Sequence, residues 1–118
     1  LSVLKAKPND ILILENRESH IHPKGQSIIG KLIAYAAQTG VQILVETHSD
    51  HLINGIRVAV KEEKLSRENV KLFYFERYAK DFDLQTISHE ILIDKNGELS
   101  KYPEGFLDEW DKQLMNLI

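Results

Sequence analysis

The chain has 118 residues, a formal net charge of −3, 42% hydrophobic and 28% charged residues, and no cysteine. This composition is typical of one globular domain and excludes an intrinsically disordered chain, disulfides, thiolate zinc sites and thiol catalysis. No apolar run approaches the length of a membrane-spanning helix and no signal-peptide pattern is visible, so we expect a cytoplasmic protein without a membrane contact. The slightly acidic balance argues against a purely electrostatic nucleic-acid binder, and no residue pattern identifies a nucleic-acid surface.

The first half of the chain alternates between strand and helix patterns. Residues 11–14 are an unbroken apolar run and residues 41–45 are apolar except for Gln42, and both predict strands buried on both faces of a parallel sheet. Residues 26–38 between them have apolar side chains at helical spacing, and Gly40 ends that helix. Ser49 or Asp50 is expected to cap a second helix with the apolar face Leu52, Ile53, Ile56 and Val60. This order predicts a parallel α/β layer.

The second half has a different pattern. Residues 71–78 are rich in Phe and Tyr and predict a strand, and residues 86–94 alternate with apolar positions on one face. Asn96-Gly97 predicts a tight turn that pairs residues 87–94 with 98–100, whereas residues 81–83 are expected to form an exposed loop. Residues 106–117 predict a final amphipathic helix. We expect one domain over 1–118, with an α/β part over 9–64 and a part over 70–118 whose strands extend the parallel sheet.

One short motif is misleading. Residues 25–31 fit the start of a phosphate-binding loop, Gly-x-x-x-x-Gly-Lys. The following residue is Leu32, where the loop needs Ser or Thr to reach Mg²⁺, and no strand directly precedes the motif. We therefore interpret Gly30 as a small residue at a close contact of a core-facing helix.

Polar residues follow both predicted parallel strands, at residues 15–23 and 46–51. Four of the five histidines of the chain fall in these two segments. In open α/β sheets, ligands bind beyond the carboxyl ends of the strands. The sequence therefore predicts a ligand-binding or catalytic site where these two segments meet.

These segments carry a resemblance to a known family. Glu-Asn-Arg-Glu-Ser-His-Ile-His-Pro at 15–23 resembles the Walker B and D-loop region of ABC-type ATPases, in the branch with RecF-like and SMC-like heads and the overcoming-lysogenization-defect nucleases. Thr47-His48-Ser49 resembles the H-loop of the same proteins. Residues 46–57 are similar to a subset of bacterial predicted ATPases, whose tail of unknown function resembles residues 94–106. The resemblance implies the C-terminal lobe of a P-loop NTPase, with a parallel sheet extended by a hairpin and a helix.

The resemblance also implies roles for individual residues. Glu15 would hold Mg²⁺, and His48 with Ser49 would contact the γ-phosphate of ATP. The D-loop would face the partner head in a homodimer, and it comprises Ser19, His20, Ile21, His22 and Pro23. Asn16 falls on the position of the catalytic glutamate, and an amide cannot act as a general base. Either Glu15 or Glu18 therefore takes over, or hydrolysis is slow.

Three ATP-binding motifs of this family are missing: the phosphate-binding loop, the Q-loop and the Leu-Ser-Gly-Gly signature. We expect the N-terminal half of the same polypeptide to supply them, and we expect this chain alone to lack ATPase activity. The function implied is ATP-driven dimerisation of heads that drives an effector, with DNA-related and phage-defence roles suggested by analogy.

Two alternatives stay open. The first is a metal-dependent hydrolase, since the two polar segments contain metal-ligand residue types, namely His20, His22, His48, Asp50 and His51. The second is a non-catalytic interaction domain whose C-terminal hairpin and helix form a docking surface.

Overall fold

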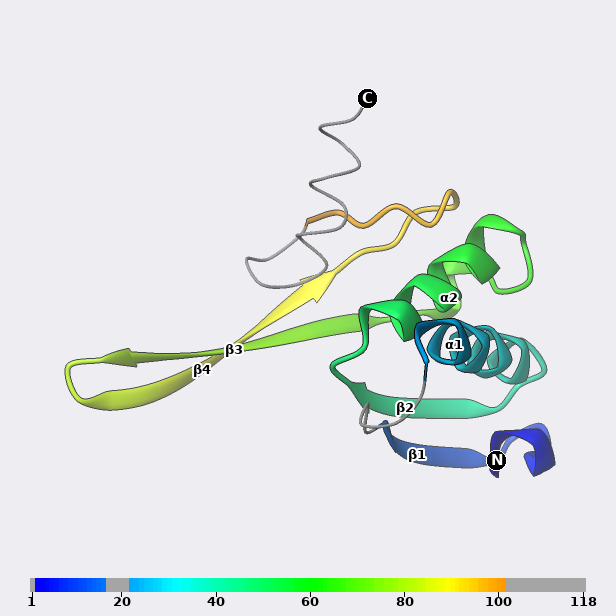
Figure 1. The fold of residues 1–118 in the computed structure, drawn as a ribbon, viewed down its shortest axis with the longest axis horizontal. Coiled ribbons are helices and arrows are strands. Elements are labelled where there is room, and N and C mark those ends of the chain that lie inside the picture. Colours follow the sequence, from blue (N-terminus) through cyan, green and yellow to red (C-terminus); the bar gives the residue numbers. More distant parts are fainter. Residues whose placement is uncertain (1, 17–21, 102–118) are drawn as a thin grey trace.

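The structure, a computed structural model, describes residues 2–16 and 22–101. The elements in chain order are η1 (Ser2–Lys5), β1 (Ile11–Asn16), α1 (Pro23–Gln38), β2 (Gln42–Thr47), α2 (Asp50–Lys61), η2 (Arg67–Asn69), β3 (Leu72–Lys80) and β4 (Asp83–Ile91). The predicted order of strand, helix, strand and helix is confirmed (Figure 1). The amphipathic helix predicted over 106–117 lies outside the described residues.

Strands β1 and β2 pair in parallel, with Ile11 beside Gln42 and Asn16 beside Thr47. Helices α1 and α2 lie on one side of this pair (Figure 1). Half-buried and exposed residues alternate along both strands, and Ile13 is 82% exposed. The expectation of strands buried on both faces is therefore wrong for the described chain, because its helices cover only one face.

Helices α1 and α2 pack closely at a pair of glycines. A Cβ added to Gly30 would clash with the carbonyl oxygen of Leu52, and one added to Gly55 would clash with the carbonyl oxygen of Ser27. Each added Cβ would also lie 3.2 Å from the Cα of the opposite glycine. The Gly-x-x-x-x-Gly-Lys match is thus part of α1, which confirms Gly30 as a helix-contact residue.

The hydrophobic core joins the two halves of the chain. Ala34 of α1 packs in one cluster with three residues of α2, Ile53, Ala59 and Val60. The cluster also contains residues that follow the helices, namely Leu65, Ile91, Ile93 and Leu99. Leu52 and Ile91 are the largest fully buried side chains. The segment after β4 is consequently anchored on the helices rather than on the parallel strands.

Strands β3 and β4 form a separate antiparallel sheet that projects from the rest of the structure (Figure 1). They pair from Leu72 with Ile91 to Lys80 with Asp83, and the two turn residues Asp81 and Phe82 have φ values of 51° and 70°. We expected the strands of the second half to extend the parallel sheet. This expectation is wrong for the described residues, which form two separate two-stranded sheets. Residues 81–83 are exposed, as expected: Asp81 and Phe82 form the tight turn between the strands, and Asp83 begins β4.

The predicted hairpin around Asn96-Gly97 is present only in reduced form. Ile93 and Leu99 make one isolated antiparallel bridge, and the Gly97 amide donates to the Asp94 carbonyl over 3.0 Å. Gly97 has a φ of 78°, the left-handed conformation that favours glycine. Two further backbone hydrogen bonds support this pairing, from the Asp94 amide to the Glu98 carbonyl over 2.9 Å and from the Ser100 amide to the Leu92 carbonyl over 2.8 Å.

Candidate site at the carboxyl ends of β1 and β2

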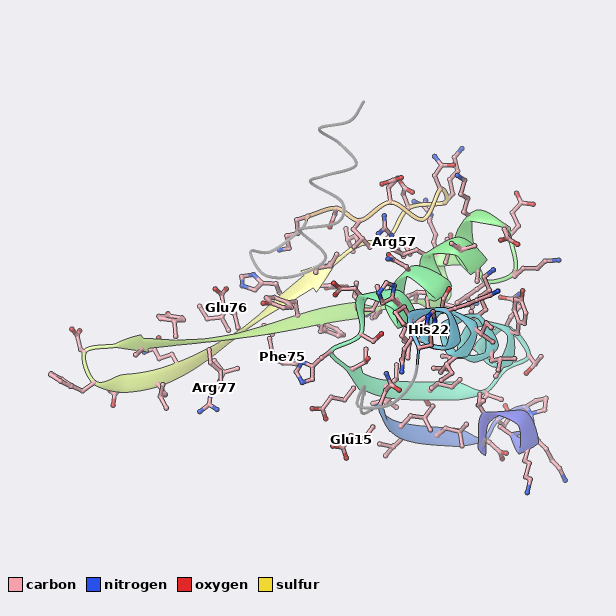
Figure 2. All side chains as sticks on the ribbon, viewed as in Figure 1. Glu15, His22, Arg57, Phe75, Glu76 and Arg77 are labelled. Carbon is pink, nitrogen blue, oxygen red and sulfur yellow. The ribbon has the colours of Figure 1, made fainter. Side chains whose placement is uncertain are left out.

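The parallel register brings the predicted site residues to one edge of the sheet. Glu15 pairs with Glu46 and Asn16 pairs with Thr47, so His48 follows directly at the same edge. Figure 2 shows Glu15 at the end of β1, next to the start of the segment that leads into α1. Both glutamates are exposed and belong to the exposed set of alternating strand residues. Two carboxylates thus lie side by side on the sheet face that the helices leave open.

Asn16 and Thr47 belong to the opposite, half-buried set of strand residues. The Asn16 Nδ2 amide donates to Gln26 Oε1 over 2.8 Å and to Thr47 Oγ1 over 3.0 Å. The Thr47 hydroxyl oxygen also accepts from the Ser49 backbone amide over 2.9 Å. Asn16 therefore links β1, α1 and the end of β2 through hydrogen bonds.

The residues of the predicted H-loop, Thr47, His48 and Ser49, lie at the end of β2 and before α2. Ser49 is the N-cap of α2: its side chain is buried and accepts from the Leu52 amide over 3.2 Å. This confirms the cap predicted at 49 or 50. His48 is exposed, whereas its neighbours Thr47 and Ser49 are held by hydrogen bonds. The imidazole is therefore presented to solvent from a fixed backbone.

Two residues of the predicted D-loop, His22 and Pro23, are described by the structure and lie at the start of α1. His22 is the N-cap, and its Nδ1 accepts from the Lys24 amide over 3.2 Å. Pro23 follows as the first helical residue, where its missing amide hydrogen costs nothing. Both residues are exposed. The remaining predicted residues of this segment, Glu18, Ser19, His20 and Ile21, lie outside the described residues.

The residues of the metal-hydrolase alternative do not assemble in the described ranges. No group of three or more His, Asp or Glu side chains that could hold a metal occurs among residues 2–16 and 22–101. The fifth histidine, His89, contacts Glu76 over 3.3 Å on the β3–β4 sheet, far in the chain from the two polar segments. This removes geometric support for a site that includes His22, His48, Asp50 and His51.

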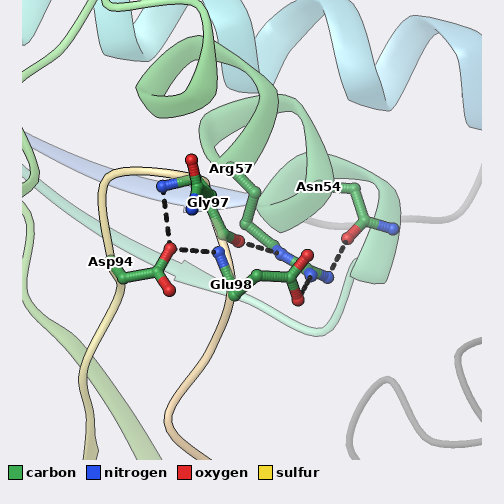
Figure 3. Close-up of polar contacts among 6 residues, drawn as sticks. Asn54, Arg57, Asp94, Gly97 and Glu98 are labelled. Atoms are coloured by element: carbon green, nitrogen blue, oxygen red, sulfur yellow. Dashed lines mark hydrogen bonds and ion pairs between the residues drawn. The ribbon is translucent and has the colours of Figure 1, made fainter.

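A separate polar joint connects α2 to the turn after β4 (Figure 3). Arg57 donates from Nε to the Gly97 carbonyl over 2.7 Å and from a terminal nitrogen to Asn54 Oδ1 over 3.0 Å. Its other terminal nitrogen lies 3.6 Å from a carboxylate oxygen of Glu98. Arg57 therefore connects α2 to the turn at Gly97 and Glu98.

Two residues of the strand-end region were not singled out from the sequence. Glu46 was visible only as part of a polar segment, and its position beside Glu15 depends on the strand register. Gln26 is an ordinary polar residue near a helix start, yet it is 3% exposed and hydrogen-bonded to Asn16.

A surface hollow of about 590 Å³ lies away from this region, at the C-terminal end of α2, where Lys61, Arg67 and Lys95 contribute to its lining.

Comparison with protein families divides the chain at α2. Residues 1–54 match the family described as "AAA domain, putative AbiEii toxin, Type IV TA system". Residues 65–117 match the family described as "Protein of unknown function (DUF3696)". Curated proteins and solved structures gave no match. Among the described residues, no helix is long and apolar enough to span a membrane.

The AAA match covers β1, α1, β2 and the first residues of α2, and thus the whole strand-end region. The second match agrees with the tail of unknown function that the sequence resembles after residue 94. Residues 1–54 are therefore similar to an AAA, P-loop ATPase-like segment, which indicates an ATPase-related function for this part of the chain.

Proposed function

We propose that the carboxyl ends of β1 and β2 form the Mg²⁺ and γ-phosphate side of an ATP site in an ABC-type ATPase head. The observation that supports this most is the register, which places Glu15, Glu46 and the start of the His48 loop at one sheet edge. The AAA match over the same residues is independent support. The assignment to the branch of RecF-like, SMC-like and related heads rests on the sequence resemblance.

The residues present fit a magnesium-bound nucleotide. Mg²⁺ prefers hard oxygen ligands and keeps several waters, so it needs only one or two carboxylates. Glu15 and Glu46 supply two such groups on an exposed face. They would hold the ion, and the bound Mg·ATP would supply the phosphoryl group that is transferred to water.

The chain's own groups would divide the remaining work. His48 is exposed on a fixed backbone, so its ring can donate a hydrogen bond to a phosphate oxygen. Asn16 donates both amide hydrogens within the protein and lacks the basicity that a general base needs. A carboxylate, from Glu15, Glu46 or Glu18, would therefore accept the proton of the attacking water.

The site would be completed by other parts of the protein. The Gly-x-x-x-x-Gly-Lys match lies inside α1, so the phosphate-binding loop would come from an N-terminal part of the polypeptide beyond these 118 residues. The segment that ends at His22 and Pro23 would face a second head in a homodimer. ATP-driven association of heads would then act on an effector through the rest of the protein.

The test is ATP turnover by the native polypeptide that contains this chain. We expect Mg²⁺-dependent release of phosphate from ATP by that protein and none from the 118 residues alone. Turnover by the isolated chain at one site per molecule, or no ATP binding by the native protein at any Mg²⁺ concentration, would contradict the proposal.

A further inference from the structure

We propose that Asn16 is a positioning residue that ties the end of β1 to the His48 loop through Thr47. The inference rests on the proposed function for its catalytic consequence, whereas the tie itself rests on the hydrogen bonds of the structure. Asn16, which falls on the position of the catalytic glutamate in the ATPases that the sequence resembles, would thus have a structural role.

The tie is a chain of three hydrogen bonds. Asn16 Nδ2 donates to Thr47 Oγ1 over 3.0 Å, Thr47 Oγ1 accepts from the Ser49 amide over 2.9 Å, and the Ser49 hydroxyl accepts from the Leu52 amide over 3.2 Å. The first bond joins two strands, the second spans His48, and the third begins α2. The backbone on both sides of His48 is therefore fixed relative to β1.

Burial limits the other arrangements that these hydrogen-bonded groups could adopt. Ser49 is 5% exposed and Gln26, the second acceptor of the Asn16 amide, is 3% exposed. Polar groups that are withdrawn from water need partners within the protein, so the alternatives to this arrangement are few. In the described part of the chain the Gln26 Nε2 amide has no partner, so the network can donate one further hydrogen bond.

An amide suits position 16 better than a carboxylate does. Both contacts of Asn16 Nδ2 are made to oxygen atoms that accept its hydrogens. A carboxylate has no hydrogen to donate, so Asp or Glu would require both Gln26 and Thr47 to reorient their polar groups. Thr47 Oγ1 accepts from both Asn16 and the Ser49 amide, so a side chain at position 16 without any polar group would leave the Thr47 hydroxyl, and with it the His48 loop, without its contact to β1.

The experiment compares four variants of the native polypeptide. Asn16→Leu keeps the approximate size of the side chain and removes its polar group, and Thr47→Val removes the shared hydroxyl. Thr47→Ser retains the hydroxyl and serves as the conservative rescue. Thr39→Val is the matched control, since Thr39 donates only locally to the Ala36 carbonyl at the exposed end of α1.

Two readouts are needed. Hydrogen exchange of the Ser49 amide should accelerate by about three- to tenfold in Asn16→Leu and Thr47→Val, as expected for loss of one hydrogen bond. The kcat for ATP should fall by about tenfold or more, with KM within about threefold, because misplaced catalytic groups slow the chemical step. Thr47→Ser and Thr39→Val should stay near wild type in both readouts.

The outcomes separate the tie from the proposed function. Unchanged exchange in Asn16→Leu and Thr47→Val, or faster exchange without any loss of kcat in an active protein, would overturn the positioning role. If the wild-type protein neither binds nor hydrolyses ATP, the proposed function fails, and faster Ser49 exchange in the two variants would still establish the tie.

Discussion

Glu15 and Glu46 are register partners in the parallel pair, on its exposed face and at its carboxyl edge. Like charges directly opposite each other on neighbouring strands are unfavourable. In the proposed ATP site, a Mg²⁺ ion held by Glu15 and Glu46 would lie between these two carboxylates.

Substitution of Glu46 tests this relationship. We expect Glu46→Gln to weaken Mg²⁺-dependent ATP turnover by about 10- to 100-fold, because one of the two carboxylates would be lost. Turnover should be measured as a function of Mg²⁺ concentration. Glu90→Gln, an exposed change on β4, is the matched control. Equal Mg²⁺ dependence in both variants would exclude Glu46 from the site.

His48 is expected to act on the nucleotide and not on the fold. Its side chain is exposed, so His48→Ala should leave the thermal unfolding midpoint nearly unchanged. ATP turnover should fall by about 100-fold, the effect of losing a donor at a developing negative charge. His51→Ala, a second exposed histidine three residues along, should retain wild-type turnover. Unchanged turnover in His48→Ala would remove His48 from the site.

The close approach of α1 and α2 at Gly30 and Gly55 predicts a large stability effect from a small change. An added methyl group at either glycine would meet a backbone carbonyl of the other helix, which cannot move without separating the helices. We expect Gly55→Ala to lower the free energy of unfolding by about 1–3 kcal/mol. Denaturant unfolding would measure this, with Lys24→Ala on α1 expected to change it by less than about 0.5 kcal/mol. A neutral Gly55→Ala would mean that the helices do not pack at these glycines.

Arg57 should matter more to stability than its ion-pair partner does. Its Nε donates to the Gly97 carbonyl from a side chain that is only 15% exposed, whereas Glu98 is 67% exposed at 3.6 Å. We expect Arg57→Met to cost about 1.5–3 kcal/mol and Glu98→Gln less than about 1 kcal/mol. Chemical denaturation of both variants checks the ranking. Equal losses would show that the ion pair, and not the carbonyl contact, stabilises the joint.

The order of the first four elements and the Ser49 cap could be predicted from the sequence, because their signals are local. Apolar periodicity and a capping serine depend on neighbours within one or two turns. The exposure of Ile11 and Ile13 could not be predicted in the same way, since burial depends on what covers each face of the sheet. The hydrogen bonds of Asn16 likewise need a contact with Thr47, 31 residues away.

The pairing of β3 with β4 was not predicted because its turn lacks the usual signal. Asp81 and Phe82 adopt positive φ, a conformation for which Asn and Gly are the common choices, and Phe is a rare one. Asn96-Gly97 has the strong signal and does form a turn, with one antiparallel bridge between Ile93 and Leu99.

The most direct test of the ATP-site proposal is the affinity of the native polypeptide for a non-hydrolysable ATP analogue, with and without Mg²⁺, in wild type and in Glu15→Gln. We predict binding that requires Mg²⁺ in the wild-type protein and is weakened by about tenfold or more in Glu15→Gln. Binding that is insensitive both to Mg²⁺ and to this substitution would contradict the placement of the nucleotide at the ends of β1 and β2.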